Sequence, residues 1–111
     1  SIPAGAKAAL DALSQFDALK ILVTPGMVEL GARQEELNRA FGAQAAAVCD
    51  LVVLVGERQT QPIAAGLLGA GFAQELVKTA ETVQEAVALA DAFRPGEARV
   101  ILLENDLPDN Y

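Results

Sequence analysis

Residues 21–31 read Ile-Leu-Val-Thr-Pro-Gly-Met-Val-Glu-Leu-Gly, and the rest of the chain is organised around this stretch. Its first, β-branched residues are typical of a buried strand, which Pro25 and Gly26 end abruptly. In a parallel α/β sheet, ligands usually bind at the loops that follow the carboxyl ends of the strands. Two glycines in this loop permit positive φ angles and close backbone approach. Residues 24–31 therefore form the candidate functional loop.

The composition predicts one globular domain over residues 1–111. The chain is 52% hydrophobic and 21% charged, which suits a single core. Its net charge of −7 and its scattered Lys and Arg residues form no basic patch, so we expect no nucleic-acid partner. One cysteine and no histidine exclude a disulfide framework, a Cys/His zinc site and a nucleophile activated by histidine.

The same counts predict a cytoplasmic protein without a membrane partner. A single cysteine fits a reducing compartment. No apolar run approaches the roughly 20 residues that span a bilayer. The start of the chain also lacks a basic segment followed by an apolar one, the pattern of a signal peptide.

Stripes of helical period alternate with short apolar runs along the chain. Helices are expected at about 4–15 and opening near residues 33, 61 and 82, and strands at 20–24, 51–55, 75–78 and 99–103. This alternation predicts a three-layer, Rossmann-like α/β domain, in which helices cover both faces of a mainly parallel sheet of about four strands. No strand precedes the first helix, which suggests that an upstream element is missing.

Local signals refine this scheme. Thr60 is expected to cap the third helix, and Thr82 with Glu85 has the form of a capping box. Gly42 costs about 1 kcal/mol relative to alanine in a helix, so we expect close packing there. Asn38 falls outside the apolar stripe of the same helix, on its polar side.

Three further groups of residues have plain structural explanations. C-capping accounts for the glycines at 66, 69 and 71. Phe16 and Phe93 extend the apolar stripes of the first and fourth helices, and Val48 extends that of the second. Cys49 lies between a helix stripe and a buried strand, where an inert core thiol is expected.

An acidic tail follows the last strand. Its carboxylates, from Glu104 to Asp109, should lie at the same sheet edge as the candidate loop. They could bind a cation, position an ammonium group or simply face solvent. The chain has no dinucleotide-binding or P-loop pattern and therefore no phosphate cradle of its own. A response-regulator receiver is disfavoured, because residues 24–26 lack the acidic pair that such domains carry after the first strand.

Taken together, residues 24–31, 51–56 and 104–111 resemble the C-terminal domain of Mur ligases, and the resemblance covers essentially the whole chain. It is closest to the branch that adds D-alanyl-D-alanine to a UDP-N-acetylmuramoyl tripeptide. Residues 1–7 resemble the end of the family's Asn-x-Asn-Pro loop, with Ile2 in place of the second Asn.

The resemblance implies an ATP-dependent amide ligase of peptidoglycan precursor synthesis, with the roles in cell shape and cell division that follow. In this family ATP phosphorylates the carboxylate of the UDP-N-acetylmuramoyl peptide, and an amine attacks the acyl phosphate. A central ATPase domain, absent from this chain, carries the P-loop and the Mg ligands. The C-terminal domain closes over it and excludes water. The isolated chain is therefore expected to be inactive, with no catalytic and no metal-binding residues of its own.

The resemblance also suggests which residues meet the substrates. The residues expected to bind substrate or position the closing domain are Gly26, Met27, Glu29, Asn105 and Asp106, and Pro3 belongs to the ATP-side loop. Packing of the loop is an equally open role for Met27 and Leu30. A stand-alone α/β interaction or small-ligand module, without catalysis, is the alternative function.

Overall fold

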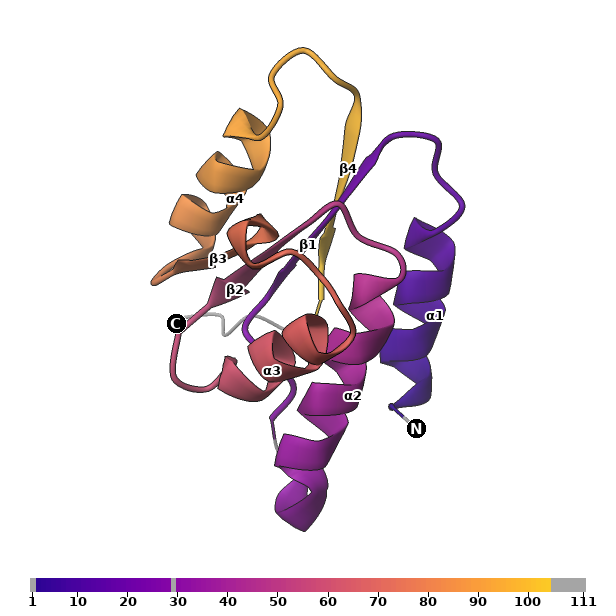
Figure 1. Ribbon diagram of the computed structural model, residues 1–111, viewed down its shortest axis with the longest axis vertical. Coiled ribbons are helices and arrows are strands. Elements are labelled where there is room, and N and C mark those ends of the chain that lie inside the picture. Colours follow the sequence, from indigo (N-terminus) through magenta and orange to yellow (C-terminus); the bar gives the residue numbers. More distant parts are fainter. Residues whose placement is uncertain (1, 29, 105–111) are drawn as a thin grey trace.

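The computed structural model describes residues 2–28 and 30–104 (Figure 1). Helices and strands alternate along the chain, with two short 3-10 turns. The helices are α1 (Ala4–Leu13), α2 (Gln34–Ala46), α3 (Gln61–Gly69) and α4 (Val83–Ala92). The strands are β1 (Leu19–Thr24), β2 (Leu51–Val55), β3 (Val77–Ala80) and β4 (Arg99–Leu103), and the 3-10 turns are η1 (Gly31–Arg33) and η2 (Gln74–Leu76).

The four strands form one parallel sheet in the order β3-β2-β1-β4. Val23 of β1 is paired with Val53 of β2 on one side and with Leu103 of β4 on the other. The β2 strand is buried throughout, as its run of five apolar residues predicts. The expected α/β fold with a parallel sheet is confirmed.

Helices cover both faces of the sheet. Figure 1 shows α1, α2 and α3 on one side of it and α4 on the other. The side chains of neighbouring strand residues divide accordingly: Leu22 and Val52 belong to the larger core cluster under α1–α3, whereas Val23 and Val53 belong to the smaller cluster under α4. The chain thus forms the expected three layers.

Two glycines bring α2 and α3 into backbone contact. A Cβ atom at Gly42 would lie 2.2 Å from the carbonyl oxygen of Ile63, which confirms the close packing expected there. A Cβ atom at Gly66 would lie 2.0 Å from the carbonyl oxygen of Arg39. The C-capping explanation for Gly66 is therefore wrong, because this glycine lies inside α3 and faces α2. Gly71, with a φ of 91°, does fit a turn after the helix.

Several expected boundaries are wrong. Residues 74–76 form the 3-10 turn η2, so the third strand starts at Val77 instead of residue 75. The second helix ends at Ala46, two residues before Val48. Two phenylalanines that were expected to extend helices lie outside them. Phe16 follows α1 and is 50% exposed, and Phe93 has an extended backbone and caps the C-terminus of α4. No helix within residues 2–28 and 30–104 is long and apolar enough to cross a membrane.

Candidate functional site

The loop after β1 leaves the sheet through a tight turn. The backbone N–H of Gly26 donates a hydrogen bond to Oγ1 of Thr24, which is fully buried (3.0 Å). Gly26 has a φ of 88°, which an L side chain rarely adopts. A glycine at this position is therefore required by the turn itself, as the Pro-Gly signal in the sequence indicates.

Asn38 on α2 holds the next residue of the loop with both ends of its side-chain amide. The N–H of Met27 donates to Oδ1 of Asn38 (2.8 Å), and Nδ2 of Asn38 donates to the carbonyl oxygen of Met27 (2.9 Å). Nδ2 also donates to the carbonyl oxygen of Gln34 (2.8 Å). Asn38 is only 1% exposed. Although Asn38 lies outside the predicted apolar stripe, it is buried, because the loop after β1 covers this side of the first turns of α2.

The loop between β2 and α3 supports the same turn. Nε2 of Gln59 donates to the carbonyl oxygen of Pro25 (3.1 Å). Thr60 is buried and is the N-cap residue of α3, as expected, but its side chain accepts no hydrogen bond from the helix. Its hydroxyl instead donates to the carbonyl oxygen of Gly56 (2.7 Å), one helical turn back. Sequence patterns did not predict the role of either residue.

The side chains of the loop divide between core and surface. Met27 is 5% exposed and belongs to the core cluster under α1–α3, against which Leu30 packs. Val28, between them, is 57% exposed. The loop is therefore anchored at Met27 and presents its next residue outward. Glu29, expected to meet substrate, lies outside the described residues.

The end of β4 lies beside the end of β1. Besides the pairing of Val23 with Leu103, the N–H of Glu104 donates to the carbonyl oxygen of Val23 (3.0 Å). The expected meeting of the two strand ends at one edge is confirmed. Asn105 and Asp106, the tail residues expected at the site, lie outside the described residues.

The start of α1 lies at this carboxyl edge too (Figure 1). Pro3 is the residue that immediately precedes α1, and its carbonyl oxygen accepts a hydrogen bond from the N–H of Lys7 (3.1 Å). The neighbouring Ile2 is buried in the same core cluster as Met27. The structure thus brings the expected ATP-side segment and the candidate loop to one edge of the domain.

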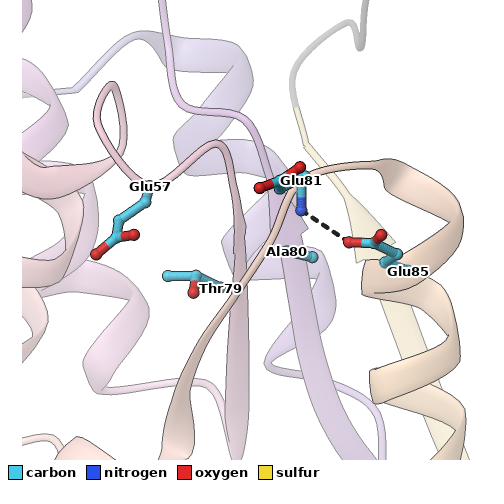
Figure 2. A pocket seen from close by; sticks show the side chains of 5 residues that line it. All are labelled: Glu57, Thr79, Ala80, Glu81 and Glu85. Carbon is cyan, nitrogen blue, oxygen red and sulfur yellow. Dashed lines mark hydrogen bonds between the residues drawn. The ribbon is translucent and has the colours of Figure 1, made fainter.

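Two surface hollows open at the carboxyl edge. The first, of about 580 Å³, lies between the start of α2 and the loop before α3, and its polar lining includes Gln34, Asn38, Arg58, Gln59 and Gln61. The second, of about 520 Å³, lies beside β3 and is lined by the acidic side chains of Glu57, Glu81 and Glu85 together with Thr79 and Ala80 (Figure 2).

The acidic hollow includes the start of α4. The N–H of Glu85 donates to Oγ1 of Thr82 (3.1 Å), as in a capping box. The Glu85 carboxylate, however, accepts from the N–H of Glu81 (3.0 Å) instead of that of Thr82 (Figure 2). The capping box is therefore confirmed in its first half only.

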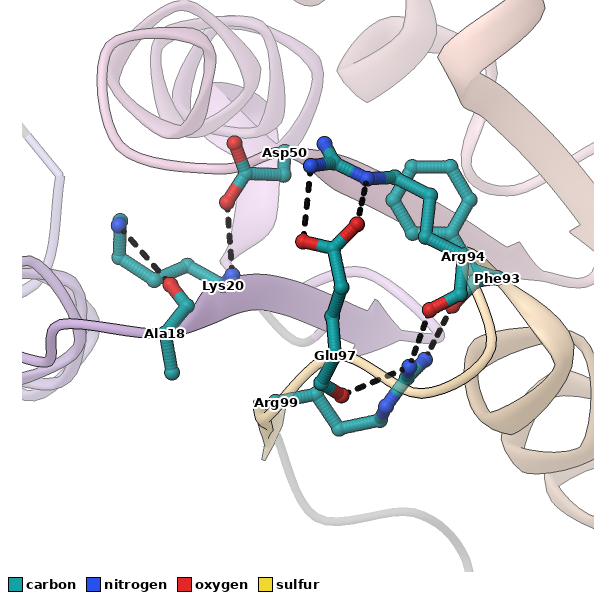
Figure 3. A network of polar contacts seen from close by, with 7 residues as sticks. All are labelled: Ala18, Lys20, Asp50, Phe93, Arg94, Glu97 and Arg99. Carbon is teal, nitrogen blue, oxygen red and sulfur yellow. Dashed lines mark hydrogen bonds and ion pairs between the residues drawn. The ribbon is translucent and has the colours of Figure 1, made fainter.

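The amino edge of the sheet is bound together by charged side chains (Figure 3). Oδ2 of Asp50 accepts a hydrogen bond from the N–H of Lys20 (2.8 Å), which ties the start of β2 to β1. Arg94 and Glu97 form a two-point ion pair in the turn before β4. The guanidinium of Arg99 donates to four carbonyl oxygens of that turn and of the end of α4, those of Ala90, Phe93, Arg94 and Glu97.

Cys49 lies at the same amino edge, one residue before Asp50. It is 9% exposed. Burial, and to a smaller degree the charge of Asp50, raises the pKa of the Cys49 thiol to about 12. The group is therefore a neutral thiol at physiological pH, and the expected inert core cysteine is confirmed.

Within residues 2–28 and 30–104, the structure shows no group of side chains that fits the phosphates of ATP or a bound magnesium ion. The sequence contains no P-loop pattern. In the part of the chain that the structure describes, no group of three or more His, Cys, Asp or Glu side chains is placed to hold a metal ion. The carboxyl edge instead provides one anchored loop, the adjacent end of β4 and two polar hollows.

Comparison with known proteins identifies the family. A family model described as "Mur ligase, glutamate ligase domain" matches residues 2–103. No curated protein and no solved structure matches the chain. Mur ligases are ATP- and magnesium-dependent enzymes of peptidoglycan precursor synthesis that act on UDP-muramoyl peptides. Because the match spans almost the whole chain, and the parallel α/β fold agrees with it, this chain belongs to the Mur ligase family as its C-terminal domain.

Proposed function

We propose that this chain is the closing domain of a ligase that joins D-alanyl-D-alanine to a UDP-N-acetylmuramoyl peptide, acting with a central ATPase domain of the same protein. One observation carries the proposal: the loop after β1 and the end of β4 lie side by side at the carboxyl edge. These are the segments in which the sequence resembles that branch of the family. The edge would form one wall of a cleft and the ATPase domain the other.

The reaction has two steps. The carboxylate of the UDP-linked peptide attacks the γ-phosphorus of ATP, which gives an acyl phosphate and ADP. The free amine of D-alanyl-D-alanine then attacks the acyl carbon, so that a C–N bond forms, the C–O bond to phosphate breaks, and inorganic phosphate and a proton leave. The closing domain contributes by orienting the amine and by excluding water from the acyl phosphate.

Some residues of this edge would hold the loop in place, and others would contact the substrate. Gly26 and Met27 fix the base of the loop through their turn and their hydrogen bonds. Glu29, two residues further along, would meet the substrate ammonium, and so would the tail residues Asn105 and Asp106. Pro3 would belong to the segment on the ATP side.

The proposal is tested with the full-length protein encoded by the reading frame that contains this chain. Phosphate release is measured with ATP, magnesium and a UDP-N-acetylmuramoyl tripeptide, while the amine substrate is varied. We expect release that depends on D-alanyl-D-alanine. A preference for a single amino acid, such as the glutamate that the family description names, would overturn the dipeptide assignment. A reading frame that starts near Ser1 and encodes no ATPase segment would favour the stand-alone module.

The tail is tested in the same assay. In the variants Glu104→Ala, Asn105→Ala and Asp106→Ala, loss of an ammonium contact is expected to lower kcat/KM for the dipeptide at least about tenfold, or ~1.4 kcal/mol. Asp17→Ala is the matched control, because this exposed carboxylate lies at the opposite, amino edge. Unchanged kinetics in all three tail variants would contradict the assignment of the tail.

A further inference from the structure

We propose that Asn38 is a positioning residue of the ligase: it holds the loop after β1 in the conformation that meets the amino substrate. This inference rests on the proposed function. Asn38 is not proposed to touch substrate. It acts through Met27, because its side-chain amide hydrogen-bonds to both the N–H and the carbonyl oxygen of that residue. These bonds fix the direction in which the exposed part of the loop leaves the core.

The hydrogen bonds fix the orientation of the Asn38 side chain. Its Oδ1 faces an N–H donor, and its Nδ2 faces two carbonyl acceptors, those of Met27 and Gln34. An amide rotated by 180° would place its NH₂ group against the N–H of Met27 and its oxygen against the carbonyl oxygens of Met27 and Gln34. Neither arrangement can form a hydrogen bond, because it pairs donor with donor and acceptor with acceptor. With 1% of its surface exposed, the side chain has little contact with water. The backbone of the loop at Met27 is therefore held in one position relative to α2.

Packing alone does not explain an asparagine here. Its helix neighbours Leu37 and Phe41 are buried and apolar, and an apolar residue at position 38 would avoid the cost of burying an amide. What an apolar residue cannot do is satisfy the N–H and C=O of Met27. The polar side chain is thus matched to the loop, and the loop carries the segment expected to contact substrate.

Gly26 is fitted to the same side chain. A Cβ atom at Gly26 would lie 3.3 Å from Oδ1 of Asn38 and 3.5 Å from Cδ1 of Ile63, at a φ of 88°. The turn residue and the amide therefore occupy adjoining space. Substitutions at the two positions should be coupled, because each changes the surroundings of the other.

The test uses two substitutions that remove the amide in different ways. Asn38→Ala leaves space, and Asn38→Leu fills it with apolar atoms, so a shared effect comes from the lost hydrogen bonds. Ala45→Gly is the matched control, because Ala45 is fully buried on the same helix and its methyl group has no hydrogen-bonding atom. It lowers the stability of α2 without changing the grip on Met27.

The first readout is amide hydrogen exchange in the 111-residue chain. In both Asn38 variants, exchange at Met27 should rise at least about tenfold relative to exchange at Val53 in the central strand β2. In Ala45→Gly the two amides should change together. If Met27 also follows Val53 in the Asn38 variants, the amide does not position the loop and the inference is overturned.

The second readout is steady-state kinetics of the full-length protein. In both Asn38 variants, kcat/KM for the amino substrate should fall at least about tenfold, with KM for ATP within about twofold of wild type. An equal fall in every parameter, or none, would overturn the positioning role. Should the wild type use another amino substrate, only the dipeptide assignment fails, and the same ratio is measured with that substrate. A wild type inactive with all amines would refute the proposed function and this role together, whereas the exchange result would still report the grip on Met27.

Discussion

The two edges of the sheet are held by opposite means. At the amino edge, several charged side chains bond to the chain's own backbone: the guanidinium of Arg99 donates to four carbonyl oxygens, and the Asp50 carboxylate accepts from the N–H of Lys20. At the carboxyl edge, a neutral buried amide and a glycine turn hold the loop. Of the charged side chains there, Glu57 and Arg58 are exposed and form no ion pair within residues 2–28 and 30–104, whereas the Glu85 carboxylate accepts from the N–H of Glu81.

The two edges therefore differ in what their charged side chains can do: at the amino edge they stabilise the fold, and at the carboxyl edge exposed ones are available to bind a ligand. Charged groups that are already hydrogen-bonded to the chain's own backbone have fewer free donors and acceptors for a ligand than exposed charged groups beside an anchored loop. Charge-assisted hydrogen bonds to backbone groups contribute more to stability than exposed ion pairs do. We therefore expect substitutions at the amino edge to lower stability, and substitutions of exposed residues at the carboxyl edge to leave it nearly unchanged.

The largest effect is expected where the support of the carboxyl edge is closest packed. Gly66→Ala forces a methyl group against the carbonyl oxygen of Arg39 and should push α3 away from α2, which carries Asn38. We expect urea unfolding to show a loss of about 3 kcal/mol. The control is Gly69→Ala, because a Cβ atom at Gly69 meets nothing within 4 Å. Equal effects of the two substitutions would contradict the close backbone contact between α2 and α3 at Gly66.

At the amino edge, Arg99→Ala should cost about 2 kcal/mol, since four carbonyl oxygens lose a charged donor and regain only water. Arg99→Lys keeps the charge but not the planar fork, and should recover only part of the loss. Urea unfolding measures both variants. Arg39→Ala serves as the control, because its contact with Glu35 is long (3.7 Å) and exposed. A loss in Arg99→Ala no larger than in this control would remove the contrast between the edges.

Cys49 tests how closed the amino edge is to solvent. Its folded pKa of about 12 lies above the ordinary value of 9.0, so between these values the folded chain binds more protons than the unfolded one. The stability from this group is complete below pH 9.0 and is lost as pH rises toward 12. From about pH 8 to pH 10 the unfolding free energy should fall by about 1 kcal/mol more in wild type than in Cys49→Ala. Parallel pH profiles would show that the thiol is not buried in solution.

The smallest effect on stability is expected at the exposed carboxyl edge. Arg58→Ala should change the unfolding free energy by less than about 0.5 kcal/mol, because the side chain forms no ion pair with any described residue. The same urea titration detects this. A loss comparable to that of Arg99→Ala would show that the two edges are not held differently.

The sequence predicts those parts of the molecule that follow a periodic pattern or a local signal. The apolar runs of β1 and β2 are buried on both faces, so their composition alone reveals them. Gly42 indicates a close contact between helices, because a glycine inside a helix lowers stability unless it serves packing. The meeting of β1 and β4 at one edge follows from the parallel topology.

The missed features depend on contacts between distant segments. Asn38 is buried by a loop, and a loop adds no periodicity to the helix that it covers. Gln59 reaches Pro25 across 34 positions of sequence, which no local pattern records. Thr60 occupies the N-cap position, yet its hydroxyl donates to the carbonyl oxygen of Gly56 and accepts no hydrogen bond from α3. These residues hold the candidate site together, and they became visible only in three dimensions.

The most direct test of the account is amide hydrogen exchange of the full-length protein, with and without a UDP-N-acetylmuramoyl tripeptide, D-alanyl-D-alanine and a non-hydrolysable ATP analogue. If the carboxyl edge forms one wall of the substrate cleft, protection should increase at Met27, Val28 and Arg58 and stay unchanged at Ala18 and Glu97 of the amino edge. Increased protection at the amino edge alone, or equal protection of both edges, would contradict it.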